Sequence, residues 1–186
     1  YYLLHWKFDS EGNARLATPE ELHIQISLLQ STDDQHVDIK QRSCTESHKT
    51  LGVHDNPISN HRTEYNHLFA KGRNMAQLIS AQTVTRPEAW PAYRNIYRAS
   101  VSYSLPVTSF TRQELDKIQR RPIQVLLSAM GFNRNMPRAV VFGPASLGGI
   151  GLHRLYIEQG SLKTMVVLGH IRHNGRLGQM IWIALQ

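Results

Sequence analysis

Basic side chains are the first residues in this sequence with a clear chemistry. The 186 residues carry 21 Lys or Arg against 14 Asp or Glu, a formal net charge of +7. Such groups bind phosphate oxygens and release counterions from a nucleic-acid backbone, and a guanidinium can fork onto a phosphate. We therefore expect a polyanion-binding surface, while an ordinary basic surface remains the alternative.

The basic residues Arg62 and Arg73 fall on one side of an expected helix between residues 59 and 84. At about 100° per residue they share a stripe, from which Lys71 points away. We expect the two arginines to contact phosphate, and an ordinary solvated helix flank is the alternative. Asn66 and Gln77 belong to the same stripe. The adjacent apolar face consists of Tyr65, Leu68, Phe69, Gly72, Met75, Ala76 and Ile79.

Two carboxylates stand side by side at Asp33 and Asp34. A carboxylate pair can hold a divalent metal ion for catalysis. Here the neighbours Gln30–Thr32 and Gln35 are polar, which favours a solvated turn. We therefore expect no catalytic residue in this chain.

Ten histidines raise the question of a metal site. His170 and His173 lie near the end of an expected helix, and His36, Cys44 and His48 are strung along an expected hairpin. Neither group has the paired Cys/His spacing of a zinc module, so we expect no metal ligands. The single cysteine excludes an internal disulfide, has no identifiable general base and fits a reducing compartment.

The stretch His48–Pro57 separates strands and turns from helices. Alternation of apolar with polar or small residues over Lys49–Val53 predicts a half-buried strand, in which Gly52 marks a bulge or a close backbone approach. Asp55–Pro57 should stop this strand, because proline lacks a ladder donor. Similar alternation makes Val37–Arg42 its candidate partner.

Short strands and turns are expected before that stretch. Tyr1–Phe8 is short and rich in aromatic residues, Asp9–Asn13 is a turn, and Arg15–Thr18 returns as an edge strand. Over His23–Leu29 strict alternation favours a strand, although Pro19–Glu21 could open a helix.

Helices follow almost without interruption. Capping boxes start two of them, at Thr85–Glu88 and Thr111–Glu114. Pro122 should kink or divide the second, and Gly131 should end it. Arg120 and Arg121 at the expected kink are a second candidate phosphate contact. The helix that starts at Thr85 should end before Pro106 and bury Trp90, Tyr93, Ile96 and Tyr97.

Glycines and prolines punctuate the last third of the chain. Asn133–Arg138 is a polar, basic loop, and Pro137 opens a short segment through Phe142. Gly143–Gly151 predicts a tight packing loop, since it lacks the Gly-Lys-Ser/Thr spacing of a phosphate loop. A helix over Leu152–Ile171 and a last one from Leu177 complete the expected elements.

The strand Lys49-Thr50-Leu51-Gly52-Val53, leading through a turn into a basic helix, resembles the primer grip of retroelement reverse transcriptases. There the last palm hairpin passes into the thumb. The segment from Gly143 to Leu152 resembles the region after the thumb in eukaryotic retrotransposon polymerases. Three further stretches are similar to the same family: Glu88-Ala89-Trp90-Pro91-Ala92-Tyr93, Tyr103-Ser104-Leu105-Pro106 and Gly131-Phe132-Asn133-Arg134-Asn135-Met136-Pro137-Arg138.

This resemblance implies a parent enzyme that copies RNA into DNA, with Mg²⁺ as the metal that assists nucleotidyl transfer. It implies that Lys49, Thr50, Leu51 and Gly52 position the primer end. The family's catalytic Asp pair follows an aromatic residue in a hydrophobic hairpin, upstream of the region that Tyr1–Phe8 resembles. The catalytic carboxylates would then lie outside this chain.

We therefore expect an α+β fold, with a small antiparallel strand region over residues 1–56 and a mostly helical, thumb-like bundle over 57–186. The expected function is to grip the RNA/DNA template–primer duplex together with the remainder of the polymerase chain, with no cofactor in this segment. A stand-alone basic helical nucleic-acid-binding domain and an interaction scaffold are the alternatives.

The sequence also bears on where in the cell the protein lies and on whether the chain is part of a longer protein. No apolar run reaches the length of a membrane span and no signal peptide is visible, so we expect an intracellular protein, nuclear or cytoplasmic, and no membrane partner. The chain begins at Tyr1 and stops one residue after the apolar run Met180–Leu185. We expect it to be a piece of a longer protein.

Overall fold

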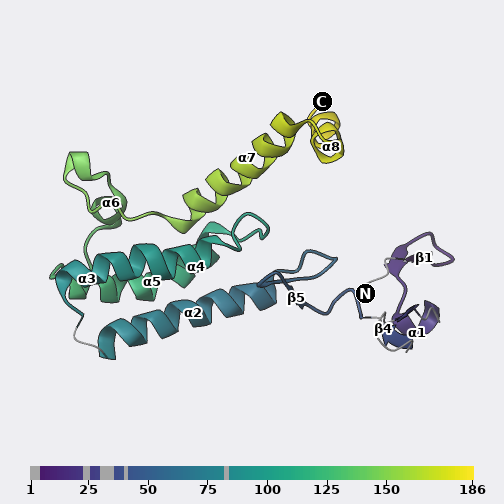
Figure 1. The fold of residues 1–186 in the computed structure, drawn as a ribbon, viewed down its shortest axis with the longest axis horizontal. Helices are drawn as coiled ribbons and strands as arrows, with labels where there is room; N and C mark the ends of the chain where they lie inside the picture. The colour runs from purple at the N-terminus through teal and green to yellow at the C-terminus, as the bar shows by residue number, and fades with distance from the viewer. Residues whose placement is uncertain (1–4, 23–25, 30–35, 40–41, 82–83) are drawn as a thin grey trace. The chain divides into compact units, whose positions relative to one another are not determined.

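The chain has the predicted α+β fold, seen in a computed structural model that describes residues 5–22, 26–29, 36–39, 42–81 and 84–186. It divides into two compact units, Tyr1–Thr63 and Glu64–Gln186. Among the described residues, strands pair two by two in the first unit and helices build the second (Figure 1). The division falls in the first turn of helix α2, whereas the sequence places it after residue 56.

The first unit begins with the predicted hairpin. β1 (Trp6–Phe8) pairs antiparallel with β2 (Ala14–Leu16). The Asp9 carboxylate closes the turn between them by accepting backbone N–H bonds from Glu11 and Asn13, at 2.9 and 2.8 Å. Residues 1–4 of the predicted first strand lie outside the described residues.

The segment after this hairpin contains both a helix and a strand, the two alternatives that the sequence offered for it. Pro19–Leu22 forms the short helix α1, and Ile26–Leu29 forms strand β3. β3 pairs with β4 (His36–Ile39). The prediction that Val37–Arg42 pairs with Lys49–Val53 is therefore wrong, because the alternation that makes both segments strands carries no information about partners. Asp33 and Asp34 lie outside the described residues.

Lys49–Val53 is not one strand but the turn of a hairpin. β5 (His48–Thr50) pairs with β6 (Val53–Asp55), and Thr50 faces Val53 across a two-residue turn. Leu51 and Gly52 both have positive φ, 50° and 91°, as a type I′ turn requires. Alternation over five residues is the same in a strand and in the two arms of a tight hairpin, and for this reason the prediction of one strand fails.

The chain leaves this hairpin through Asn56, a buried residue. Its side-chain oxygen accepts the backbone N–H of Asn60 at 2.8 Å, and its amide group lies 3.4 Å from the Thr45 carbonyl. The predicted stop of the strand at Asp55–Pro57 is confirmed, since β6 ends at Asp55. Asn60 then accepts the first N–H of the next helix, from Arg62, at 3.1 Å.

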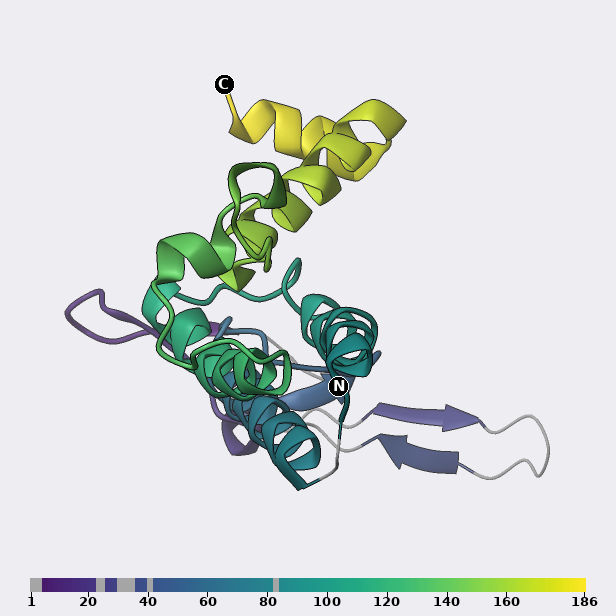
Figure 2. The same cartoon turned by 90° about the vertical axis from the view of Figure 1, so that its left-hand side faces the viewer.

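Helix α2 (Arg62–Ala81) presents the predicted apolar face to the core of the second unit. Leu68, Gly72, Ala76 and Ile79 are buried, whereas Phe69 at the edge of this face is 36% exposed. The helix lies beside α5 (Arg112–Ala129), and Figure 2 views these helices nearly end-on. A Cβ on Gly72 would stand 2.8 Å from the Ile118 carbonyl oxygen of α5, so glycine permits this close approach.

The capping box at Thr85 is present and opens one helical stretch from residue 86 to residue 102. It comprises α3 (Arg86–Pro91), the π-helical segment η1 (Ala92–Arg98) and α4 (Ala99–Ser102). Tyr93 and Tyr97 are buried as predicted, and burial raises the pKa of both hydroxyls. Ile96 is 65% exposed, contrary to prediction, because each residue of a π-helix turns through a smaller angle than in an α-helix and the apolar face shifts.

Helix α5 also begins at its predicted capping box, but it is not divided at Pro122. Proline lacks the N–H that would bond the Ile118 carbonyl four residues earlier. The buried Tyr97 hydroxyl donates to that carbonyl instead, at 3.4 Å. Gly131 ends the helix as predicted, with φ of 80°, and the Phe132 N–H returns to the Leu127 carbonyl at 2.8 Å.

The last third follows the predicted order of elements. α6 (Arg138–Phe142) and the 3₁₀ turn η2 (Ala145–Leu147) precede α7 (Leu155–His173) and α8 (Arg176–Ala184). The predicted packing loop is confirmed, because a Cβ on Gly149 would overlap the Gly143 carbonyl. α7 starts later than predicted, since the Leu152 N–H bonds the Val141 carbonyl at 3.0 Å.

One hydrophobic core holds the second unit together. The buried Gln159 of α7 both donates to and accepts from the backbone of Phe110, at 3.0 and 3.1 Å, which fixes α7 to the start of α5. Within the part of the chain that the structure describes, no helix combines the length and apolar character that crossing a membrane requires. The core contains Leu68, Ala89, Tyr93, Tyr97, Val101, Leu105, Phe110, Leu115, Ile118, Ile123, Leu126, Leu127, Val141, Leu152 and Leu155.

Candidate nucleic-acid interface

The charge of the chain is distributed unequally between the two units. Residues 64–186 contain fifteen Lys or Arg and five Asp or Glu, a formal charge of +10. Residues 1–63 contain six basic and nine acidic residues, a formal charge of −3. The overall +7 therefore understates how basic the helical unit is.

Each of the five carboxylates of the helical unit either contacts another residue of that unit or is buried in it. Two belong to capping boxes, where hydrogen bonds from Thr85 lower the pKa of Glu88 and Thr111 donates to Glu114 at 2.9 and 2.8 Å. Two lie in ion pairs and one is buried. These three are Asp116 with Arg154 at 2.8 Å, Glu158 with Arg98 at 3.0 Å, and Glu64, which is 1% exposed.

Polar side chains from α2 and α5 line two adjoining hollows, which together we call the α2–α5 groove. The first, of about 440 Å³, is lined by Arg73, Gln77 and Ser80 of α2 and by Arg121 of α5, with Ala76 and Ala81. The second, of about 380 Å³, shares Ser80 and Arg121 with the first. Its other lining residues are Ile79, Val84, Gln124, Val125, Ser128, Ala129 and Arg134.

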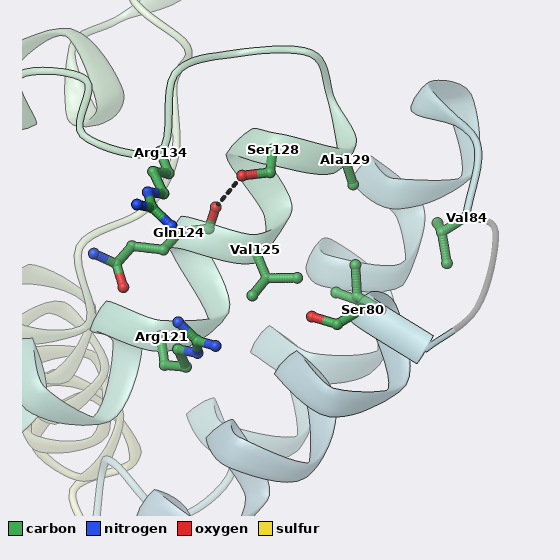
Figure 3. A pocket seen from close by; sticks show the side chains of 9 residues that line it. Ser80, Val84, Arg121, Gln124, Val125, Ser128, Ala129 and Arg134 are labelled. Carbon is green, nitrogen blue, oxygen red and sulfur yellow. Dashed lines mark hydrogen bonds between the residues drawn. The ribbon is translucent and has the colours of Figure 1, made fainter.

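Helical spacing explains why these donors form a row. Arg73 and Gln77 are four residues apart on α2, and Arg121 and Gln124 are three apart on α5, so each pair shares one helix face. In Figure 3 the polar ends of Arg121, Gln124 and Arg134 gather on one side of the second hollow, while Val84, Val125 and Ala129 line the other side. The Ser128 hydroxyl donates to the Gln124 carbonyl at 3.1 Å.

The three arginines of the groove face solvent without a neutralising carboxylate. Among the residues that the structure describes, none of the ion pairs involves Arg73, Arg121 or Arg134. All three side chains are exposed. Free guanidinium groups beside Gln and Ser donors, over an apolar floor, suit the oxygens of a phosphate backbone.

The structure separates arginines that the sequence groups together. Arg73 and Arg121, predicted on different helices, line the same hollow. Arg120, predicted to act with Arg121, projects from another face of α5 and lines a different hollow beside Asp116. Lys71 donates to the Ser100 carbonyl at 3.3 Å and lies outside the groove lining.

The remaining predicted contacts lie within the first unit. Arg62 is the exposed first residue of α2, about 16 Å along the helix axis from Arg73. Lys49, Thr50, Leu51 and Gly52 are exposed at the β5–β6 hairpin, where Leu51 is 86% exposed.

Sequence reasoning missed Gln124, Ser128 and Arg134 as members of the groove. The first two could have been found from their spacing of three and seven residues after Arg121. Arg134 could not, because it joins the groove only when the chain reverses at Gly131 and returns past α5.

Metal-ligating side chains do not gather in the described regions. Among the residues that the structure describes, no group of three or more His, Cys, Asp or Glu side chains is placed to hold a metal ion. The sole cysteine, Cys44, is buried in the first unit.

No protein-family model, curated protein or solved structure matches this chain. Its function is therefore inferred from the charge and geometry of the α2–α5 groove and from the motifs in its sequence.

Proposed function

We propose that the helical unit binds the sugar–phosphate backbone of a nucleic-acid duplex along the α2–α5 groove. The observation that carries this proposal is the row of three unpaired arginines, Arg73, Arg121 and Arg134, in a unit whose carboxylates are all taken up by the fold. Backbone contacts fix the position of a duplex without reading its sequence. Binding is thus electrostatic and independent of base sequence.

The groove residues have distinct roles in this proposal. The guanidinium groups of Arg73, Arg121 and Arg134 each contact a phosphate, where a forked geometry favours Arg over Lys. Gln77 and Gln124 donate further hydrogen bonds to the backbone. The floor formed by Ala76, Ile79 and Val125 contributes shape rather than charge.

The chain as a whole is proposed to be the end of the palm and the thumb of a reverse transcriptase from a eukaryotic retrotransposon-type element. The order of a tight hairpin at Lys49–Asp55 followed by a basic helical unit supports this, together with the motifs from Glu88 to Leu152. The hairpin tip at Leu51 and Gly52 positions the primer end, and the helical unit holds the template–primer duplex. Catalytic carboxylates and the Mg²⁺ chemistry belong to the remainder of the polymerase chain.

A duplex-binding assay over a range of salt concentrations tests the groove. Affinity for a mixed-sequence duplex should fall steeply as salt rises, with a slope of about 0.9 per phosphate contacted. Arg73→Ala, Arg121→Ala and Arg134→Ala should each reduce that slope by about one unit and weaken binding equally across sequences. The matched control is Arg94→Ala, because Arg94 is exposed on η1 and lines neither hollow.

Three outcomes separate the rival functions. A flat salt response would favour an interaction scaffold. Equal losses from Arg94→Ala and from the groove variants would show general surface attraction and not a groove. A stand-alone nucleic-acid-binding domain is distinguished by the coding sequence before Tyr1: a reverse transcriptase requires an aromatic-x-Asp-Asp hairpin there.

A further inference from the structure

A second basic hollow lies on another side of the helical unit. Side chains from α5, from α6 and from the residue before α7 line a hollow of about 280 Å³, which we call the α5–α6 hollow. It shares no lining residue with the α2–α5 groove. Its lining residues are Asp116, Gln119, Arg120, Ile123, Arg138, Phe142 and Arg154.

Positive charge exceeds negative charge in this hollow. The Asp116 carboxylate bonds Arg154 through both oxygens, at 3.2 and 2.8 Å from the same guanidinium nitrogen, and Arg154 also stacks over the Phe142 ring at 5.6 Å. Arg120 and Arg138 are exposed and belong to none of the ion pairs among the described residues. Two guanidinium groups are thus available to an anion.

Gln119 adds a buried donor to the same hollow. The residue is 2% exposed, and its side-chain oxygen accepts the Leu155 N–H at 2.8 Å. That bond fixes the orientation of the amide, because a flipped amide would place two donors face to face. The amide nitrogen then has no hydrogen-bond partner among the described residues. A buried unpaired donor is unfavourable and calls for a bound acceptor.

We infer that the α5–α6 hollow is a phosphate-binding site. A phosphate group presents oxygens in several directions, which suits donors that come from α5 and α6. The Gln119 amide nitrogen takes one oxygen and the guanidinium groups of Arg120 and Arg138 take the others, while Arg154 stays held by Asp116. The phosphate is either part of a nucleic-acid backbone or a free phosphate or mononucleotide. This site does not depend on the duplex-binding role of the α2–α5 groove.

Calorimetric titration of the 186-residue chain with inorganic phosphate, at constant ionic strength kept with chloride, tests the inference. Saturable one-to-one binding is expected. Arg120→Gln and Arg138→Gln should each weaken it by about tenfold or more, as loss of a charged hydrogen bond does. Arg138→Lys should recover part of the affinity. Arg94→Gln removes an equal charge outside the hollow and should leave the affinity unchanged.

Gln119→Glu is the sharpest variant. It retains the acceptor for the Leu155 N–H, but it replaces the unpaired donor with a carboxylate oxygen that repels phosphate. Phosphate binding should disappear, and circular dichroism and thermal melting establish whether the variant is folded, because a buried carboxylate lowers stability. If this variant fails to fold, the decision rests on the two arginine variants, which change exposed side chains only.

The results that overturn the inference are specific. Absence of saturable phosphate binding would refute it, as would an equal loss from Arg94→Gln and Arg138→Gln. Displacement of phosphate by a duplex identifies the backbone as the source, and retention identifies a free phosphate or nucleotide. Arg73→Ala and Arg121→Ala should leave phosphate binding intact, so failure of the groove proposal is distinguishable from failure of this one.

Discussion

At the scale of single residues, the arginines of this chain fall into two groups according to whether a carboxylate lies within reach. Arg98 and Arg154 are half-buried and tie η1 and α5 to α7 through Glu158 and Asp116. The exposed Arg73 and Arg121 have no such partner among the described residues. The first group serves the fold, and the second is available to phosphate.

The ion pair between Arg15 and Glu21 in the first unit provides a pH-dependent prediction. The Arg15 guanidinium, with hydrogen bonds of 3.0 and 2.7 Å, and the Thr18 N–H lower the pKa of Glu21 from 4.5 to about 2. Since the folded-state pKa is depressed, the ionised Glu21 stabilises the unit above about pH 4.5, and this contribution is lost as pH falls from about 4.5 towards 2. Arg15→Gln should return the Glu21 pKa towards 4.5, measured by carboxyl NMR titration. An unchanged pKa in that variant would contradict the ion pair.

The bond from Tyr97 to the Ile118 carbonyl predicts a coupling with Pro122. Tyr97→Phe leaves that buried carbonyl without its donor and should cost about 1–2 kcal/mol of unfolding free energy. Pro122→Ala restores a backbone N–H that can bond the same carbonyl. In that background Tyr97→Phe should cost less, with a coupling energy of about 1 kcal/mol in urea denaturation. Strictly additive effects would show that the hydroxyl does not substitute for the missing N–H.

At the scale of elements, the β5–β6 hairpin combines strain with exposure. Leu51 adopts φ of 50°, a conformation that Asn and Gly adopt with less strain than Leu, and its side chain is 86% exposed. Neither propensity nor burial explains a leucine at this position. The proposed function gives this exposed apolar side chain a role, contact with the primer end.

Substitution of the turn tests this trade between stability and binding. Leu51→Asn should stabilise the chain by about 1 kcal/mol in thermal or urea unfolding, because Asn suits a type I′ turn. The same change should weaken binding of a recessed primer–template relative to a blunt duplex. Gly52→Ala, at φ of 91°, is the opposite control and should destabilise. Unchanged preference for the recessed end in Leu51→Asn would remove the hairpin tip from the proposed site.

At the scale of the whole molecule, the two units differ in net charge as well as in secondary structure. The helical unit carries +10 and the strand-containing unit −3. A duplex should therefore be held by the helical unit, with the first unit contributing little to electrostatic affinity. In the proposed function, duplex grip and primer positioning therefore belong to different units.

Removal of residues 1–56 tests this division. The remaining chain of residues 57–186 retains α2 and the whole core of the helical unit, and should bind a blunt duplex at least as tightly, with the same salt slope. Preference for a recessed primer end should be lost. Circular dichroism and thermal melting establish that the shorter chain is folded. A folded chain without duplex affinity would place the binding surface in the first unit.

The sequence by itself determined where several helices and one strand begin or end, because those signals are local. Capping boxes at Thr85 and Thr111, the stop at Gly131 and the end of the hairpin strand at Asp55 each depend on residues within a few positions of one another. Periodicity likewise located α2 and its buried face. For the candidate site, sequence identified Arg73 and Arg121 separately, as exposed charges on two helices.

Only the tertiary structure decided which of these local pieces meet. Gly72 lets α2 approach α5 closely enough for Arg73 and Arg121, 48 positions apart in sequence, to line one hollow. The turn of about 100° between consecutive helical residues sends Arg120 to a different hollow from Arg121. Arg134 reaches the groove through a chain reversal, and Pro122 is tolerated because Tyr97 supplies the missing bond. Contacts between distant segments depend on the packing of whole surfaces, and local patterns in the sequence do not encode it.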